Sequence, residues 1–239
     1  YYIVEEDVNF SWSITPLPLI FSWNSVQPEG AVWDNNKIVY DSLTSTPRAQ
    51  YFVFDVDNIS SRDEVTFFVQ LTVGGAAPVN RTVEFDANGL DLEDFISFMN
   101  ANSINAGSYQ AKIIALTGTG SGNYTLENAT EPEKNWEITP AAIDLTIHTN
   151  LFVVDYNGSS NAFIYNGLNQ TANILVRNVF NATSDNDYLA FGSQYTVTGN
   201  SGINAGNYTA VVTLNRNGNY IFTNKITSSF EWKTSWRID

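Results

Sequence analysis

The side chains that could carry out chemistry in this chain of 239 residues are mostly carboxylates, with 25 Asp and Glu residues, one histidine and no cysteine. Without cysteine there can be no disulfide framework, no thiol catalysis and no cysteine-based metal site. The single histidine, His148, counts against a Ser-His-Asp triad or a multi-histidine metal site. We expect its side chain on the outward face of a strand.

The carboxylates could instead act in pairs or bind a cation. A glycosidase needs an acidic carboxyl group and a second carboxylate held close by, but no spacing in the sequence indicates such a pair. Calcium is a stronger alternative, because loop carboxylates and carbonyls can bind it and stiffen domain junctions. The richest oxygen clusters are FDANGLDLED, residues 85–94, and TSDNDY, residues 183–188. Neither has EF-hand spacing, so we assign no metal ligand and no catalytic residue, and we expect a non-enzymatic protein without a cofactor.

Six tryptophans raise the question of carbohydrate binding, because an exposed indole face can stack on a sugar ring. Four of them are expected in protein cores by their positions in the repeat described below: Trp12, Trp23, Trp136 and Trp236. Trp33 and Trp232 have no counterpart in that repeat. These two residues are therefore the candidate ligand-binding residues, and a carbohydrate-binding module centred on the first domain is the alternative function.

Charge and hydropathy narrow the choice of partners. The formal net charge is −14, which argues against nucleic acid and anionic membranes as partners. No run approaches the roughly 18 apolar residues of a membrane-spanning helix, so we expect no membrane insertion. The sequence shows no signal peptide, and we interpret it as a mature or excised piece of a longer protein.

Three motifs recur in the same order, which indicates tandem repeats. INAGSYQAKI at 104–113 returns as INAGNYTAVV at 203–212. YDSLTST at 40–46 returns as YNGLNQT at 165–171. The third motif is Trp-x-Ile-Thr-Pro, which occurs at 12–16, at 136–140 and, without its Thr-Pro, at 236–238.

These motifs predict the domain boundaries. Residues 13–139 form a first domain and residues 140–239 a second one. Residues 1–12 are the last strand of a preceding repeat or an addition to the first domain. An insertion at about 74–101 is present only in the first domain.

Within each repeat the apolar residues alternate, which indicates half-buried β-strands. The expected inward faces are these: Leu19, Phe21 and Trp23; Val65, Phe67, Val69, Leu71 and Val73; Tyr109, Ala111, Ile113 and Ala115; Ile143, Leu145 and Ile147; Tyr208, Ala210, Val212 and Leu214. The glycine- and asparagine-rich stretches at 118–123 and 215–219 are expected to be hairpin turns. The pattern predicts an all-β protein made of two tandem immunoglobulin-like antiparallel β-sandwich domains, the first with a short helical insertion.

Two further expectations concern local structure. In the repeated phrases, Ala-Gly-x-Tyr is typical of a tyrosine corner, in which the hydroxyl of Tyr109 or Tyr208 bonds back to the preceding backbone. In the insertion, Leu90 to Ala101 predicts a helix, because its apolar residues have helical spacing and its acids fall in the first turn. We expect that helix to cover an open edge or end of its own domain.

The combined motif Tyr-x-Gly-Leu, Ile-Asn-Ala-Gly-x-Tyr-Thr, Gly-Asn-Tyr and Trp-x-Ile-Thr-Pro resembles bacterial immunoglobulin-like repeats of the MBG type. The resemblance covers residues 140–239 and the flanks of the first domain, 13–73 and 102–139; the insertion departs from it, as does Ser42 where the second copy has Gly167. It implies a tandem repeat of a large secreted or cell-surface protein, and it carries no functional residues. We therefore expect an extracellular, monomeric spacer or adhesin. Its expected partners are neighbouring repeats of the same chain and a surface glycan or protein receptor.

Overall fold

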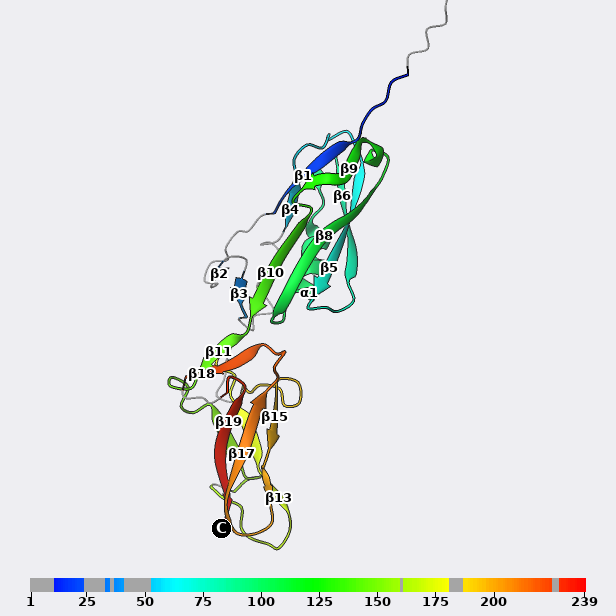
Figure 1. Cartoon of the computed structure of the whole chain (residues 1–239). Helices are drawn as coiled ribbons and strands as arrows, with labels where there is room; N and C mark the ends of the chain where they lie inside the picture. The colour runs from blue at the N-terminus through cyan, green and yellow to red at the C-terminus, as the bar shows by residue number, and fades with distance from the viewer. Residues whose placement is uncertain are drawn as a thin grey trace, which may run out of the picture.

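The chain forms two β-rich bodies that lie end to end (Figure 1). The structure is a computed structural model, and it describes residues 11–23, 33–34, 37–40, 53–159, 161–180, 187–224 and 228–239. Strands β1 to β10 pair only among themselves, and so do strands β11 to β19. These two sets are called the first unit and the second unit below. In the described parts the fold is all-β, with one α-helix, α1 (Glu93–Asn102), and one 3-10 turn.

The first unit contains a three-stranded sheet and a seven-stranded sheet. The three-stranded sheet has the order β4 (Phe54–Val56), β1 (Leu17–Trp23), β9 (Tyr124–Thr130). The seven-stranded sheet has the order β2 (Trp33–Asp34), β3 (Lys37–Val39), β10 (Glu133–Thr139), β8 (Gly107–Thr117), β5 (Val65–Val73), β6 (Val79–Asp86), β7 (Gly89–Leu90).

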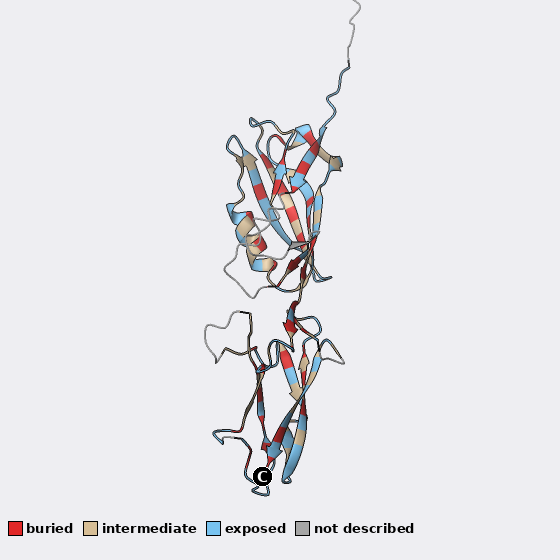
Figure 2. Cartoon of the chain, turned by 90° about the vertical axis from the view of Figure 1, so that its left-hand side faces the viewer, coloured by how far each residue is buried: buried red, intermediate tan, exposed pale blue. Residues whose placement is uncertain are grey.

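Aromatic rings join these two sheets. Phe21 of β1 lies edge-on to Phe67 of β5, with ring centroids 5.9 Å apart, and Phe54 of β4 lies 5.8 Å from the same ring. All three side chains are buried, as are the predicted inward residues Leu19 and Trp23, whereas Val73 at the end of β5 is half-buried. Buried residues are coloured red along the strands of Figure 2. Each such side chain contributes roughly 1.5–3 kcal/mol by leaving water.

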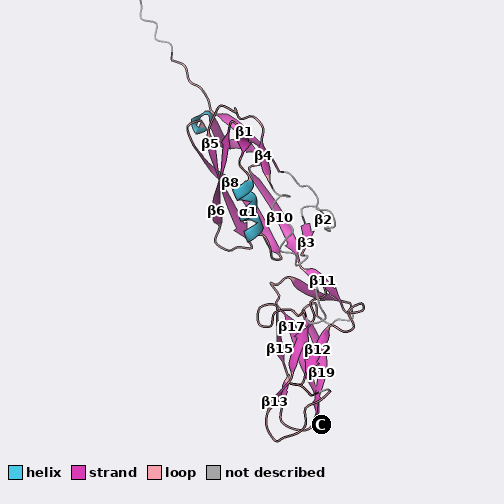
Figure 3. Cartoon of the chain, turned by 180° about the vertical axis from the view of Figure 1, so that it is seen from behind, coloured by secondary structure: helices cyan, strands magenta, loops and turns pink. Residues whose placement is uncertain are grey.

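Helix α1 is present where the sequence predicts it. Its first turn carries Glu93 and Asp94, which favour the positive end of the helix dipole. Phe95 and Met99 are fully buried, and the Phe95 ring lies edge-on to Phe54 at 5.7 Å. Figure 3 shows α1 in front of the seven-stranded sheet, below β1 and β4. The helix thus covers the part of that sheet which the smaller sheet leaves open.

The prediction of the inward face of β8 is wrong at the last residue of that face. Ala115 of β8 is exposed, although Tyr109, Ala111 and Ile113 of the same strand are buried as expected. The cause is a bulge, because Phe68 pairs with Ala115 while the next residue, Val69, pairs with Ile113. The extra residue reverses the inside and outside positions beyond it.

The second unit is built from smaller sheets. A three-stranded sheet has the order β15 (Tyr195–Thr198), β17 (Gly206–Leu214), β19 (Glu231–Ile238). The paired strands are β11 (Ala141–Asp144) with β18 (Tyr220–Thr223), β12 (Phe152–Asp155) with β14 (Asn173–Val176), and β13 (Gln170–Thr171) with β16 (Ser201–Gly202). The predicted inward residues Ala210, Val212 and Leu214 are buried, and Tyr208 is half-buried.

The repeated motifs occupy equivalent places in the strand pairing of both units. Tyr109 pairs with Trp136 in the first unit, as Tyr208 pairs with Trp236 in the second. A parallel pairing between Ile38 and Ile138 has its counterpart in a bridge from Phe163 to Ile238. Likewise, β1 begins parallel to β9 at Leu17 and Tyr124, as β11 begins parallel to β18 at Ala141 and Tyr220. The repeat therefore extends from sequence to hydrogen-bond register.

These parallel pairings correct the expectation of a purely antiparallel fold. The glycine-rich turns also differ from hairpins. After residues 118–123 the chain enters β9, which pairs with β1, and after 215–219 it enters β18, which pairs with β11. Each turn therefore carries the chain from one sheet to another.

Two apolar residues lie where the repeat did not predict them. Ile147 is 71% exposed because β11 ends at Asp144, whose side chain accepts hydrogen bonds from both the amide and the hydroxyl of Thr146. Such an aspartate turn competes with the strand. Trp12 is 80% exposed, although Trp136 and Trp236 are buried, because no described strand pairs with residues 11–16.

No helix among the described residues is long and apolar enough to cross a membrane.

Candidate functional site

The two repeated tyrosines make the corner that the sequence predicts. Tyr109 donates its hydroxyl proton to the carbonyl of Asn105 at 2.5 Å, and Tyr208 donates to the carbonyl of Asn204 at 2.6 Å. Each tyrosine also stacks on the tryptophan opposite it, with centroids 5.3 Å apart in the first unit and 4.5 Å in the second. These contacts fix the entry of a strand, and they give the tyrosines a structural role.

The glycine of each phrase has a backbone that other residues rarely adopt. Gly107 has a φ of +157° and Gly206 a φ of +149°. A side chain at either position would strain the backbone, which explains why the phrase has glycine two residues before the tyrosine in both copies. The same unusual conformation at both positions supports the equivalence of the two corners.

The acidic cluster at 85–94 is held by local hydrogen bonds. Asp86 accepts the amide proton of Asn88 at 2.7 Å, and Asp91 accepts that of Glu93 at 3.2 Å, at the start of the helix. Asp94 lies 3.4 Å from the guanidinium of Arg81 on the surface. In the part of the chain that the structure describes, no three His, Asp or Glu side chains gather as metal ligands would. In the second cluster, residues 183–186 lie outside the described residues.

The two candidate tryptophans lie in different units. The backbone of Trp33 forms β2 beside β3, and its side chain is outside the described parts. Trp232 of β19 is half-buried, and its ring stacks on Phe152 with an interplanar angle of 7°. That contact places one indole face against the protein, so at most the other face could meet a sugar. The structure does not bring Trp33 and Trp232 onto one sheet.

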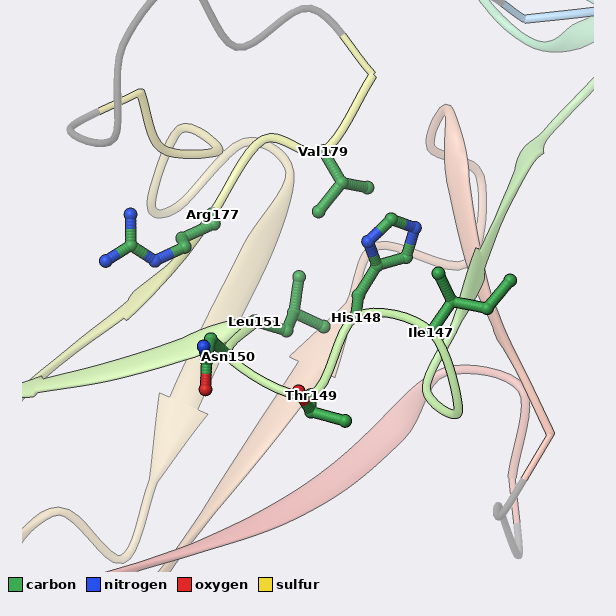
Figure 4. A pocket seen from close by; sticks show the side chains of 7 residues that line it. All are labelled: Ile147, His148, Thr149, Asn150, Leu151, Arg177 and Val179. Atoms are coloured by element: carbon green, nitrogen blue, oxygen red, sulfur yellow. The ribbon is translucent and has the colours of Figure 1, made fainter.

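His148 lies beside a small hollow of about 220 Å³ (Figure 4). The prediction that His148 lies on the outward face of a strand is wrong, because the turn at Asp144 ends β11 before this residue. The hydrogen bond from the His148 amide to the carbonyl of Asp144 is 2.9 Å long. Three hydrogen bonds from Thr146 and Asn224 to its carboxylate keep the pKa of Asp144 below its usual range. The sequence Asp144-Leu-Thr146 is typical of an aspartate turn. It is the signal that could have predicted the end of β11 before His148.

The side chains around this hollow do not converge on one point. Figure 4 shows the Arg177 guanidinium turned away from the His148 ring, with Leu151 and Val179 between the two. The Arg177 guanidinium instead lies 5.9 Å from the centroid of the Tyr188 ring. Nucleophilic catalysis requires a nucleophile within hydrogen-bond reach of a base, and among the residues labelled in Figure 4 no hydroxyl is turned toward the His148 ring.

The most elaborate set of contacts that the motifs build is the junction between the two units. Strand β10 ends at Thr139 and β11 begins at Ala141, so Pro140 alone separates the units. A proline has a fixed φ and limits the bending of a one-residue connection. The Ala141 amide donates to the carbonyl of Asn219 at 2.8 Å. This contact places at the junction the Gly-Asn-Tyr motif of the second unit, residues 218–220, whose first copy is at 122–124.

Asn219 connects the second unit to the tyrosine corner of the first. Its side-chain oxygen accepts the amide proton of Ala106 at 2.7 Å, and its side-chain nitrogen donates to the side-chain oxygen of Asn105 at 2.9 Å. A single asparagine therefore makes two hydrogen bonds across the junction. A hollow of about 490 Å³ beside it is lined from both units, including Glu137 and Arg216.

An aromatic contact closes the other side of the junction. Tyr40, which follows β3, lies edge-on to Tyr220 of β18 with ring centroids 5.4 Å apart, and both are buried. The ring of Phe180 also stacks on Tyr220, with ring centroids 5.6 Å apart. Burial, followed by the neighbouring Tyr40, raises the pKa of the Tyr220 phenol, so this group keeps its proton to a higher pH than an exposed tyrosine does.

Sequence reasoning found these residues as repeat markers and missed their role. Tyr40, Asn105 and Asn219 each belong to a recurring motif. Their recurrence in both copies was the available signal. Asn105 contacts Asn219 and Tyr40 contacts Tyr220, and both pairs join residues more than a hundred positions apart, which local patterns do not reveal.

Comparisons with known proteins give no further guide to the site. Protein-family models, curated proteins and solved structures were each searched, and none matched the chain.

Proposed function

We propose that this chain is a non-enzymatic pair of tandem immunoglobulin-like modules, of the MBG type, that acts as a spacer in a large surface or secreted protein. The observation that carries the proposal is the location of the repeated motifs. The tyrosine corner of the first unit, Tyr40 and the Gly-Asn-Tyr motif of the second unit all meet where the two units join. Residues that recur in each copy and lie at its ends are what a chain of stacked modules requires.

The junction supports the mechanical part of this role. A one-residue connection at Pro140, two side-chain hydrogen bonds from Asn219 and a buried aromatic pair restrict motion of one unit against the other. Each hydrogen bond contributes about 0.5–1.5 kcal/mol, and the aromatic pair contributes a similar amount beyond its buried area. A spacer with such a restricted junction keeps its two ends at a fixed distance and orientation.

The net charge of −14 is consistent with an exposed and soluble location. We place the module outside the cell or on its surface, as a monomer whose neighbours are further modules of the same polypeptide. If the module is also an adhesin, its surface binds a protein receptor or a glycan.

Small-angle X-ray scattering of the whole chain tests the spacer. We expect an elongated envelope that a single orientation of the two units fits, in the wild type and in an Asn123→Ala variant. Asn123 is the counterpart of Asn219 in the first unit and lies away from the junction, so it is a matched control. Asn219→Ala should broaden the range of orientations. A compact envelope, or a wild type already as variable as Asn219→Ala, would contradict the proposal.

Two screens test the remaining parts. A panel of glycosides, esters and peptides should show no turnover, and turnover that survives purification would contradict a non-enzymatic role. A glycan array separates the spacer from the carbohydrate-binding alternative. Affinity that is lost in Trp33→Ala or Trp232→Ala would favour that alternative, whereas an array without signal favours the spacer.

A further inference from the structure

The end of the second unit that faces away from the first repeats the surface by which the first unit holds its neighbour. Tyr165 is the counterpart of Tyr40 in the repeated motif, and the two have the same backbone contact. The Tyr40 amide donates to the carbonyl of Thr139 at 2.8 Å, and the Tyr165 amide donates to that of Asp239 at 2.8 Å. The backbones of the two tyrosines therefore occupy equivalent positions in their units.

The surroundings of these tyrosines differ. Tyr40 is 8% exposed because it packs on Tyr220, whereas Tyr165 is 53% exposed. Asn105 and Ala106 contact Asn219, whereas their counterparts Asn204 and Ala205 are exposed. The positions that form the junction in the first unit thus lie open in the second.

The open surface is also apolar. Alongside Tyr165, three other large apolar side chains at this end are exposed: Ile164 at 73%, Leu168 at 68% and Ile203 at 49%. Their two segments lie side by side, because Gln170 pairs with Gly202 and the Gln170 side chain donates to the carbonyl of Ile164 at 2.8 Å. We call the surface formed by Ile164, Tyr165, Leu168 and residues 203–205 the terminal face. In Figure 1 it lies at the end of the second unit that faces away from the first, near β13 and the C-terminus.

We infer that the terminal face binds the Gly-Asn-Tyr end of a further unit of this kind, in the arrangement by which the first unit holds Gly218–Tyr220. This inference rests on the proposed spacer function and names the partner of one of its surfaces. The tyrosine ring of the incoming unit packs on Tyr165, as Tyr220 packs on Tyr40. The incoming asparagine bonds the Ala205 amide and the Asn204 side chain, as Asn219 bonds Ala106 and Asn105.

The charge and chemistry of the surface favour this partner. The incoming motif is uncharged and supplies one amide and one aromatic ring, which match the exposed amide groups and apolar side chains of the terminal face. Exposed apolar clusters of this kind mark interaction sites in soluble proteins. The junction inside the chain supplies the geometry for this pairing.

The test extends the whole chain by a second copy of residues 140–239 placed after Asp239. The connection then reads Asp239-Pro140, where the native one reads Thr139-Pro140. Nitration by tetranitromethane, mapped by mass spectrometry, reports the accessibility of each tyrosine. We expect Tyr165 to react readily in the native chain and severalfold more slowly in the extended chain. In the control, Asn219→Ala and Tyr220→Ala are introduced into the appended copy alone, and the reactivity of Tyr165 should return.

A second extended chain guards against poor folding of the appended copy. In it, residues 16–139 follow Asp239, so that Gly122–Tyr124 faces the terminal face instead. If Tyr165 reacts as readily in both extended chains as in the native chain, the inference is overturned.

Tyr40 distinguishes this failure from that of the proposed function. If Tyr40 stays unreactive while Tyr165 is never protected, the terminal face has another role and the spacer stands. If Tyr40 itself reacts readily in the native chain, the junction and the spacer both fail.

Discussion

The first and second units share their ends and differ in their middles. Both have the same tyrosine corner, the same tryptophan opposite it and the same parallel strand at the entry. Between these points, the first unit has a seven-stranded sheet and a helix, whereas the second has sheets of two or three strands. At the junction that the structure contains, recurring residues of the two units therefore meet, although the bodies of the units differ.

The comparison also separates what a motif fixes from what its surroundings decide. Tyr109 is buried, because β5 extends to Val73 and pairs with it. Tyr208 is half-buried, because β15 ends at Thr198, opposite Val211, before it reaches the tyrosine. Both tyrosines keep the hydrogen bond of the corner. The motif fixes the turn, and the neighbouring strand decides the burial.

The largest expected effect concerns the tryptophan opposite the corner. Trp236 is 2% exposed, stacks on Tyr208 and donates its indole proton to the carbonyl of Gly199 at 2.9 Å. Trp236→Ala should lower the free energy of unfolding of the second unit by about 3–5 kcal/mol. Trp12→Ala should change stability by less than about 0.5 kcal/mol, because Trp12 is exposed. Guanidinium unfolding with hydrogen exchange read separately for each unit measures both. Similar losses in the two variants would show that the exposed segment is packed after all.

The glycines of the two corners come next. Gly107→Ala and Gly206→Ala should each cost about 1–3 kcal/mol, because alanine is strained at their positive φ angles. Gly122→Ala is the control, since its added methyl group meets no atom within 4 Å and its φ is not in the strained region. This control should be neutral or stabilise by up to about 1 kcal/mol. Thermal unfolding curves measure all three. A harmless substitution at Gly206 alone would break the equivalence of the two corners.

Removing the corner hydroxyls should have a smaller effect. Tyr109→Phe and Tyr208→Phe each lose one hydrogen bond to a backbone carbonyl, worth about 0.5–1.5 kcal/mol. The loss should be greater for Tyr109, because its burial leaves the Asn105 carbonyl with less access to water. Urea unfolding of the two variants measures the difference. A larger loss at Tyr208 would show that burial does not set the value of this bond.

The smallest expected effect is that of the Tyr220 phenol at the junction, which changes stability only at alkaline pH. The raised pKa of Tyr220 means that the folded chain keeps a proton which the unfolded chain loses near pH 10. Its contribution to stability is therefore complete below about pH 10 and falls as the pH rises towards the folded pKa. Tyr220→Phe should remove this part of the alkaline loss. Unfolding measured from pH 8 to pH 11 in both proteins tests it, and identical slopes would argue against a buried phenol at the junction.

Local patterns were sufficient to predict strands β1, β5, β8, β11 and β17, the helix and both tyrosine corners, because each depends on residues close in sequence. They failed at Ile147 and His148, where an aspartate turn ends a strand that the repeat predicts to continue. They failed at Trp12, because burial of a tryptophan at the end of a strand requires a partner strand. They did not reveal the role of Asn219, because its partners lie in the other unit.

The most direct test of the account is the distribution of distances between the two units. The chain has no cysteine, so Thr82→Cys and Ser235→Cys, both on exposed strand positions, place spin labels cleanly on the first and second units. Double electron–electron resonance should give one narrow distance peak, as narrow as that of a pair within the first unit, Thr82→Cys and Glu127→Cys. A broad or multiple distribution across the junction, with a narrow one inside the first unit, would contradict a fixed spacer.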